Sequence, residues 1–151
     1  MLYSENKVVF SLEDVRDLLQ NLSRKYETLQ KNSCRLVEED LTLALSHILY
    51  EISKHSEPSM QYIADNVGVD ITTFSRQVKS LIRMGLVVKR VNPNDKRIFI
   101  LQLTEKGVHS LSHLNTILST RLNQNIEGLS EFEKNTIMQA LKILTKAITH
   151  K

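Results

Sequence analysis

Apolar side chains recur at steps of three and four residues near the start of the chain. Over residues 12–31 they form one continuous stripe, which predicts an amphipathic helix. A polar stretch that contains Cys34 follows, and a second stripe over 41–54 predicts another helix. Pro58 falls in the break after it. The beginning of the chain is therefore expected to hold two helices joined by a polar segment.

Two further helical patterns cover the end of the chain. Thr104 is placed to cap a long helix, and Gly128 is expected to end it. The apolar stripe of this helix consists of Val108, Leu111, Leu114, Leu118, Leu122 and Ile126. Ser130 and Glu133 have the spacing of a capping box, so a last helix is predicted to begin there.

The middle of the chain has the spacing of a helix-turn-helix. Residues 59–66 predict a short helix, Gly68 supplies a tight turn, and Asp70 is placed to cap a second helix over 71–84. The small side chain of Ala64 lets the two helices approach each other. The inner face of the second helix is expected to include Val69, Phe74 and Val78. Its outward positions are Thr72, Thr73, Ser75, Arg76 and Lys79.

These outward side chains are suited to DNA. Short hydroxyls near a helix N-terminus suit phosphate, and an arginine suits the O6 and N7 atoms of guanine. The same spacing also occurs in ordinary pairs of helices with a polar outer face. The helix-turn-helix alone is therefore an ambiguous signal.

A predicted hairpin follows directly. Residues 86–91 and 97–103 are rich in β-branched and bulky apolar side chains, and turn-forming residues at 92–96 join them. Cationic side chains at its tip, Arg90, Lys96 and Arg97, can reach a minor groove. Asp95 is placed to hold an arginine in one orientation. The alternative is an ordinary surface ion pair that contacts no binding partner. A helix-turn-helix with such a hairpin is a winged helix.

The charge of the chain is concentrated in this region. The whole chain carries +3, but the window 76–106 holds eight Lys or Arg and two acidic residues. Such an excess is typical of a surface that binds a polyanion, and a solvated basic face is the alternative.

Several classes of protein are excluded or disfavoured. A single cysteine cannot form an intramolecular disulfide, and no glycine-rich phosphate-binding loop appears. Neither a nucleophile–base–acid set nor a metal-hydrolase signature can be found, so no enzyme and no cofactor are predicted. The sequence shows neither a signal peptide nor an apolar run of the length that a membrane requires, so a cytoplasmic location without a membrane partner is expected.

With these features, the chain resembles the MarR family of bacterial regulators. Residues 59–70 are similar to the first half of its DNA-binding lobe, and residues 71–88 to its recognition helix and the entry to its wing. Asn-Pro-Asn-Asp-Lys-Arg at 92–97 and Leu-Thr-Glu-Lys-Gly at 103–107 are similar to the wing and the start of the dimer helix.

The resemblance implies a homodimeric transcription factor that binds a pseudo-palindromic operator in double-stranded DNA. It implies one MarR-like domain over residues 1–151, with a DNA-binding lobe at 41–103 and dimerisation helices at 11–32 and 104–150. It also implies a small-molecule effector, since many relatives bind phenolic or lipophilic anions between the two lobes.

Sensing by a metal or an oxidant is kept as an alternative. His109 and His113 are four residues apart on one predicted helix, a spacing that can chelate a metal, and Cys34, His47 and Glu27 are possible further ligands. The family's zinc-sensing branch has a His pair more than a turn later in this helix. Cys34 is interpreted as a buried or inert thiol, because it is placed after the first helix.

The sequence therefore predicts a mainly α fold with a small β-hairpin wing. Its function is predicted to be sequence-specific DNA binding, as a repressor that a ligand releases. The alternatives are a metal- or redox-sensing regulator and a winged-helix module that binds another protein. The basic window argues against the last alternative.

Overall fold

The computed structural model of the chain describes residues 12–148. Its elements are α1 (Leu12–Val37), α2 (Leu43–Ser53), α3 (Met60–Val67), α4 (Ile71–Arg83), β1 (Val87–Asn92), β2 (Asp95–Leu103), α5 (Glu105–Ile126) and α6 (Glu131–Ala147). The chain forms two compact units, one up to Leu114 and one from Asn115 onward. The outer ends of the predicted dimerisation ranges, at 11 and at 149–150, lie outside the described residues. The fold is mainly α with one two-stranded sheet, as predicted.

The first helix is longer than predicted. Instead of ending near residue 32, α1 continues to Val37, so Cys34 lies inside the helix and not after it. The Ser33 hydroxyl donates a hydrogen bond to the Leu29 carbonyl within the helix at 2.7 Å, and Ser33 and Cys34 are both buried. Small polar residues therefore extend the buried face of α1 where a polar loop was expected.

The helix-turn-helix forms as predicted, with a cap at each junction. Ser59 accepts a hydrogen bond from the backbone of Tyr62, and Asp70 accepts one from the backbone of Thr73, so each residue begins a helix. Gly68 ends α3 with φ +70°, a left-handed conformation that glycine adopts without steric cost. The second predicted helix, α2, is shorter than 41–54 because Thr42 caps it.

The core of the first unit joins these helices. Ile63 and Ala64 of α3 and Phe74 and Val78 of α4 are buried, while Val69 is only partly buried. Buried residues of α2 and the strands complete this core; they are Leu45, Ile48, Leu49, Ile52, Leu86, Val87, Ile100 and Leu101. This packing fixes which side of α4 faces outward.

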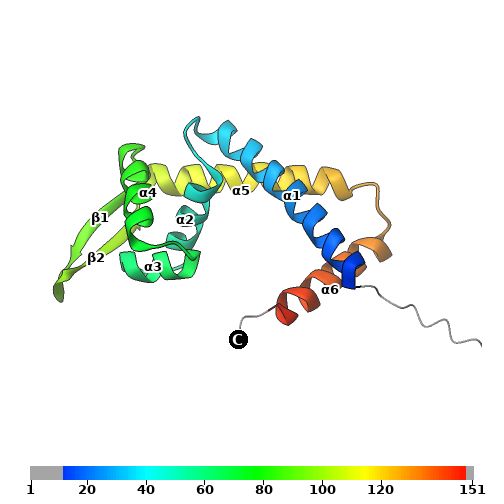
Figure 1. The fold of residues 1–151 in the computed structure, drawn as a ribbon. Helices are drawn as coiled ribbons and strands as arrows, with labels where there is room; N and C mark the ends of the chain where they lie inside the picture. The colour runs from blue at the N-terminus through cyan, green and yellow to red at the C-terminus, as the bar shows by residue number, and fades with distance from the viewer. Residues whose placement is uncertain (1–11, 149–151) are drawn as a thin grey trace, which may run out of the picture. The chain divides into compact units, whose positions relative to one another are not determined.

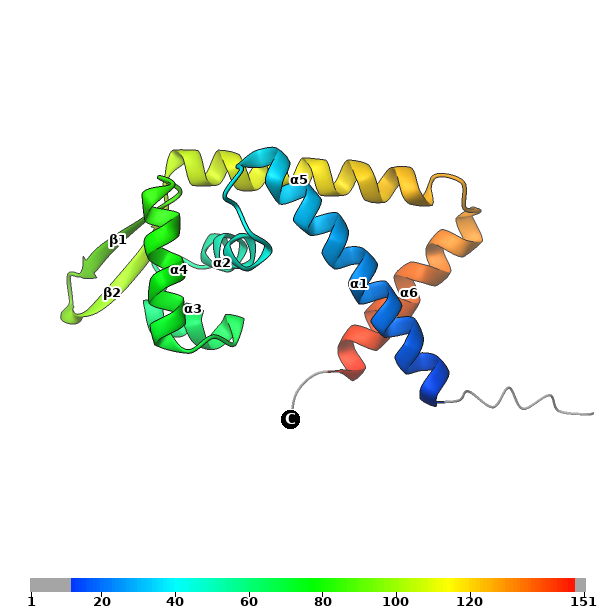
Figure 2. The ribbon, with the colours of Figure 1, turned by 45° about the horizontal axis from the view of Figure 1, so that its top comes forward.

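The wing is an antiparallel hairpin that lies beside α4 (Figure 1). Its register runs from Val87 opposite Leu103 to Val91 opposite Phe99, with an irregularity before Asn92 pairs with Asp95. Only residues 93–94 form the turn, so the predicted loop over 92–96 was too long. The reason is local: Asn92 Oδ1 accepts a hydrogen bond from the Asn94 backbone at 2.8 Å and closes the turn early. In both views of the ribbon the hairpin lies beside α4 (Figure 2), and β2 also contacts α2 and α3 directly.

The start of α5 is tied to the turn between α4 and β1. The Thr104 hydroxyl donates to the Gly85 carbonyl at 2.6 Å and accepts from the Gly107 backbone at 2.9 Å. The Thr104 backbone N–H also donates to the Leu86 carbonyl. Lys106 Nζ donates to the Met84 carbonyl at 3.0 Å. The Leu-Thr-Glu-Lys-Gly run is therefore a structural junction in which the side chains of Thr104 and Lys106 both hydrogen-bond to the backbone of the α4–β1 turn.

Both units leave apolar side chains uncovered. In the first unit Leu18 of α1 is 69% exposed, and Val108, expected within the buried stripe of α5, is 56% exposed. In the second unit the predicted capping box of Ser130 and Glu133 begins α6. None of the α6 residues whose side chains are described is buried, and its exposed apolar side chains include Phe132 at 80%. None of the described helices is long and apolar enough to span a membrane.

Candidate nucleic-acid interface

The outward face of α4 carries the predicted recognition residues. Thr72, Thr73, Arg76 and Lys79 are exposed, and Ser75 is partly buried. This orientation follows from the burial of Phe74 and Val78 on the opposite face, as the sequence predicted. The face therefore offers a guanidinium, an ammonium and hydroxyls from one rigid helix.

The N-terminus of α4 is already occupied by its own cap. The backbone N–H and then the side chain of Thr73 hydrogen-bond to Asp70 and hold the pKa of its carboxyl below the ordinary value. Asp70 therefore takes the Thr73 N–H that a phosphate would otherwise use. The Thr72 hydroxyl is exposed at this end of the helix, whereas the Thr73 hydroxyl is part of the cap.

Asp95 and Arg97 form a closed ion pair on the wing. Arg97 Nε donates to Asp95 Oδ1 and a terminal guanidinium nitrogen to Oδ2, each at 3.1 Å, and the Arg97 backbone donates to Oδ1 at 3.0 Å. These side-chain and backbone hydrogen bonds lower the pKa of Asp95, and the side-chain bond to Asp95 raises the pKa of Arg97. The Arg97 side chain is still 90% exposed. The predicted pairing of Asp95 with an arginine of the wing is thus present in the structure.

Lys89 of β1 belongs to the basic window, but it was not among the predicted site residues. Lys89 Nζ lies 4.1 Å from the centroid of the Phe99 ring, a cation–π contact. Phe99 pairs with Val91 across the hairpin, and Lys89 pairs with Leu101 one step further along the same face. The strand register brings Lys89 beside Phe99, and the register depends on the length of the turn. The contact could therefore be predicted only once the turn length was known.

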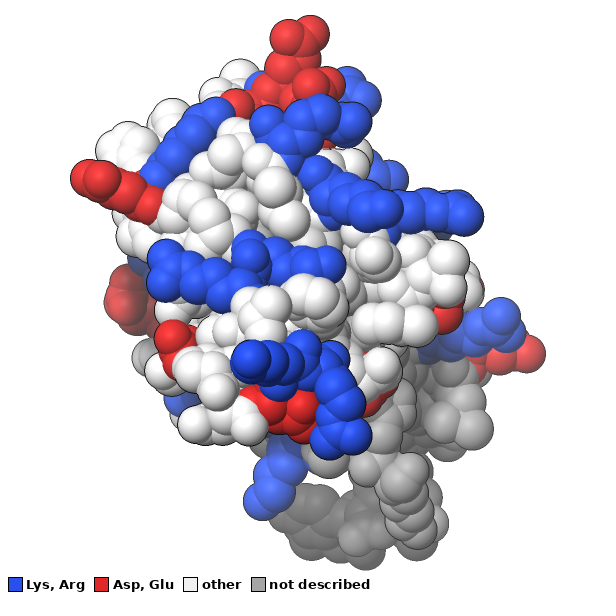
Figure 3. Space-filling model, turned by 90° about the vertical axis from the view of Figure 1, so that its left-hand side faces the viewer, with Lys and Arg blue, Asp and Glu red and all other residues white. Residues whose placement is uncertain are grey.

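The face that carries α4 and the hairpin is basic. Lys and Arg side chains cross it in several bands (Figure 3), and Arg90, Lys96 and Arg97 are exposed there with Arg76 and Lys79. One cation of the basic window has another role: Lys106 pairs with Glu38 at 3.2 Å and with the Met84 carbonyl. The other seven Lys or Arg in the window are all exposed.

The residues considered for metal or redox sensing do not come together in the described part of the structure. His47, His109 and His113 are exposed, whereas Cys34 is buried in α1. Glu27 pairs instead with Lys31 at 2.7 Å. Among residues 12–148, the structure forms no group of three or more His, Cys, Asp or Glu that can hold a metal ion.

This arrangement gives a testable expectation for sensing. Replacing His109, His113 and Cys34 together by alanine is expected to leave DNA affinity unchanged in the presence and absence of Zn²⁺ or peroxide. Fluorescence anisotropy with a bound duplex measures this directly. A Zn²⁺ or peroxide response in the parent protein that disappears in the triple variant would contradict it.

A helix-turn-helix core with an attached two-stranded wing defines the winged helix-turn-helix class of DNA-binding folds. Comparisons with known proteins place the chain within this class. The model of the MarR family matches residues 41–99, which nearly coincides with the predicted lobe at 41–103. YybA of Bacillus subtilis, an uncharacterized HTH-type transcriptional regulator, is 31% identical over 114 residues, which cover 73% of this chain and 75% of YybA.

Other relatives and solved structures match a larger share of the chain. BilQ of Clostridioides difficile, an HTH-type transcriptional regulator, is 27% identical over 87% of this chain and 88% of its own. The crystal structure of RV1404 from Mycobacterium tuberculosis has a TM-score of 0.84 at 22% identity and covers 93% of this chain and 97% of its own. Mutant MarR C80S from E. coli gives a TM-score of 0.77 at 23% identity, over 91% and 98% of the two chains. The chain belongs to the MarR family, and it is a DNA-binding transcriptional regulator.

Proposed function

We propose that the protein is a homodimeric repressor that binds a pseudo-palindromic operator. Each recognition helix α4 enters the major groove, and each wing places Arg97 in the adjacent minor groove. The observation that carries this proposal is the guanidinium of Arg97, held by Asp95 on the unit that also presents Arg76 from α4. Selecting bound duplexes from a random DNA pool tests it, and a two-fold symmetric consensus is the expected result.

Apart from Arg97 in the minor groove, the proposed contact residues divide into two groups by their chemistry. Arg76 carries the bidentate donors that read a guanine. Phosphate contacts fall to the hydroxyl and ammonium groups and to Arg90; this second group consists of Thr72, Thr73, Ser75, Lys79, Lys89, Arg90 and Lys96. Phosphate contacts set affinity and its dependence on salt, whereas Arg76 sets sequence preference.

Arg76→Ala is expected to cost roughly 1–3 kcal/mol of binding and to relax the preference at one position of each half-site. Lys79→Ala on the same helix is the matched control. It is expected to weaken all sequences alike and to lower the slope of affinity against salt by about one. Anisotropy titrations on the selected duplex and its single-base variants distinguish the two. Equal weakening of all sequences by Arg76→Ala would make Arg76 a phosphate contact.

We also propose that α1, α5 and α6 form the dimer interface, as the ranges 11–32 and 104–150 implied. Leu18, Leu22 and Tyr26 are exposed along α1, and Phe132 and Ile143 are exposed on α6. Apolar surface of this extent marks a protein–protein contact. The two recognition helices are then set roughly 34–36 Å apart, one turn of DNA.

Sedimentation velocity at micromolar concentration is expected to show a dimer. Ile143→Glu places a charge on the exposed apolar face of α6 and is expected to dissociate or unfold the protein. Lys142→Glu, at the preceding residue, changes the charge by two units. Because Lys142 is already polar and exposed, the dimer is expected to persist in this variant. A stable, folded monomer of the unaltered chain would contradict the proposed interface.

We propose that binding of a small molecule ends repression. We also propose that the protein acts in the cytoplasm, where its operator is. The matching relatives are transcriptional regulators, which supports the absence of catalysis. No observation favours the metal-sensing, redox-sensing or protein-binding alternatives over this proposal.

A further inference from the structure

The wing holds a second cation besides Arg97, and it does so without an acid. The Lys89 ammonium lies 4.1 Å from the centre of the Phe99 ring. Within residues 12–148, no carboxylate forms an ion pair with Lys89. Both side chains lie on the surface, and Phe99 is 41% exposed although it is aromatic. The contact that places this ammonium is therefore made by an aromatic ring.

The strand register brings the two side chains together. Lys89 of β1 is paired with Leu101 of β2, and Phe99 lies two residues before Leu101 on the same strand. Lys89 and Phe99 are therefore diagonal neighbours on one face of the hairpin, a distance that long and aromatic side chains span. Leu101 is fully buried in the core of the unit. It anchors β2 next to this contact, so the backbone position of the ring is fixed.

A ring and a carboxylate hold a cation with different effects on its charge. Asp95 orients Arg97 but also offsets its positive charge. The Phe99 ring attracts the Lys89 ammonium through its quadrupole and carries no net charge. The ring covers one side of the ammonium, and the N–H donors on the other side can still bind a phosphate. Lys89 thus presents a full positive charge from a restricted position.

We propose that Phe99 is a positioning residue for DNA, which holds the Lys89 ammonium in place for a phosphate of the backbone beside the wing. This inference rests on the proposed function, in which Lys89 contacts a phosphate. Lysine is among the side chains that lose most freedom when they are fixed, and one that is already restricted loses less on binding. Phe99 therefore raises the affinity for DNA of any sequence, because phosphates carry no sequence information.

Phe99→Leu removes the ring and keeps an apolar side chain. It is expected to weaken the selected duplex by about two- to fivefold, the effect of one exposed cation–π contact. The slope of affinity against salt is expected to stay unchanged, because Lys89 keeps its charge. Lys89→Ala is expected to lower this slope by about one. Phe99→Tyr retains an aromatic face and is expected to keep the affinity of the parent protein.

A double-mutant cycle in anisotropy titrations separates this role from a direct contact of Phe99 with DNA. When Lys89 is already alanine, Phe99→Leu is expected to leave affinity unchanged, because the ring has no cation to hold. Equal weakening in both backgrounds overturns the proposal, since Phe99 would then contact DNA or support the wing itself. Tyr50→Leu is the matched control. Lys54 lies 4.1 Å from the Tyr50 ring, but on α2 and outside the basic window, so no change is expected.

Ring fluorination tests the electrostatic origin of the effect while the shape of the side chain is nearly kept. Each fluorine draws electron density from the face of the ring and weakens its attraction for a cation. Phenylalanine analogues with one, two and three ring fluorines at position 99 are expected to lower duplex affinity step by step. In the Lys89→Ala background the same series is expected to have no effect. Equal affinity across the series in the parent background overturns the proposal.

Failure of this inference can be told apart from failure of the proposed function. A protein that selects a duplex and binds it equally well as Phe99→Leu contradicts only the role of Phe99. A protein that selects no duplex contradicts the proposed function. A duplex of random sequence then still tests Phe99, because the Lys89 contact with phosphate does not depend on sequence. Weaker binding of that duplex by Phe99→Leu, in the presence of Lys89 alone, supports the inference, and equal binding overturns it.

Discussion

Gly107→Ala is expected to destabilise the protein by about 3 kcal/mol or more, at the upper end of the cost of overpacking a core. A Cβ atom at this position would overlap the backbone carbonyl oxygen of Leu86 and lie 3.0 Å from its carbonyl carbon. Backbone atoms cannot rotate away as a side chain can. The junction would have to open, which would disrupt the hydrogen bonds of Thr104 to Gly85 and Leu86. The loss is a large part of the stability of an ordinary domain, about 5–15 kcal/mol.

Urea denaturation followed by circular dichroism measures this loss, at one fixed protein concentration because a dimer's stability depends on it. Gly128→Ala is the matched control. A Cβ at Gly128 meets nothing within 4 Å, so a change within about 0.5 kcal/mol is expected there, as for an ordinary surface substitution. Equal stabilities of the two variants would show that α5 can move away from the α4–β1 turn at little cost.

The helix-turn-helix could be predicted from the sequence because its signals are local. Ser59 and Asp70 each cap a helix through a backbone N–H three residues later, and Gly68 supplies the left-handed turn between them. Each of these interactions joins residues close in the chain, so spacing alone identifies them. The inner face of α4 follows from the same periodicity, and with it the outward position of Arg76 and Lys79.

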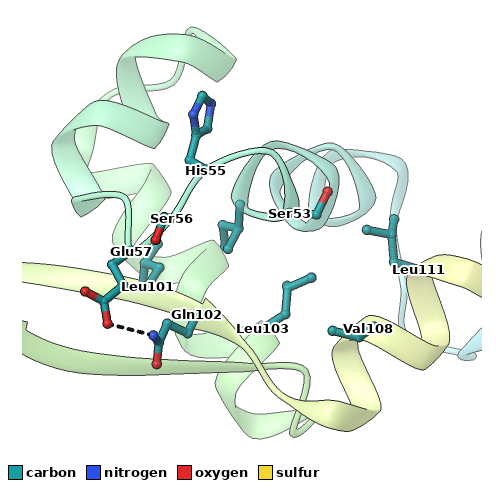
Figure 4. Close-up of a pocket in the computed structure, with 10 residues that line it drawn as sticks. Ser53, His55, Ser56, Glu57, Leu101, Gln102, Leu103, Val108 and Leu111 are labelled. Carbon is teal, nitrogen blue, oxygen red and sulfur yellow. Dashed lines mark hydrogen bonds between the residues drawn. The ribbon is translucent and has the colours of Figure 1, made fainter.

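The errors came from interactions that the spacing does not contain. The end of α1 was placed too early because the stretch around Cys34 was interpreted as a polar segment between helices, whereas the Ser33 hydroxyl hydrogen-bonds to the helix backbone and its side chain is buried. Lys106 was counted with the basic surface, but it pairs with Glu38, far away in the chain. The hydrogen bond from Gln102 of β2 to Glu57, before α3, joins residues 45 positions apart (Figure 4). Tertiary packing decides all three.

Arg97→Ala is expected to weaken binding of the selected duplex by about tenfold or more, as for one charged hydrogen-bonded contact. The guanidinium is held by Asp95 before DNA arrives, so less side-chain freedom is lost on binding. A narrow A·T-rich minor groove offers it an enhanced negative potential. Lys54→Ala removes a positive charge outside the basic window and is expected to change affinity far less. Anisotropy titrations at several salt concentrations provide the comparison.

Asp95→Ala decides between positioning and simple charge, because the two predict opposite signs. Removing an acid from a basic surface strengthens a purely electrostatic interaction, most of all at low salt. If Asp95 instead holds Arg97 for the groove, its removal weakens binding despite the gain in positive charge, and we expect this second result. Asp95→Asn keeps one oxygen that can accept from the guanidinium, so an intermediate affinity is expected. The pKa of Asp95 is lowered by its bonds to Arg97, so the effect is expected at ordinary pH and is lost only in acid, where the carboxylate is protonated. Tighter binding of the duplex by Asp95→Ala at low salt would show that Asp95 only lowers the positive charge of the surface and does not position Arg97.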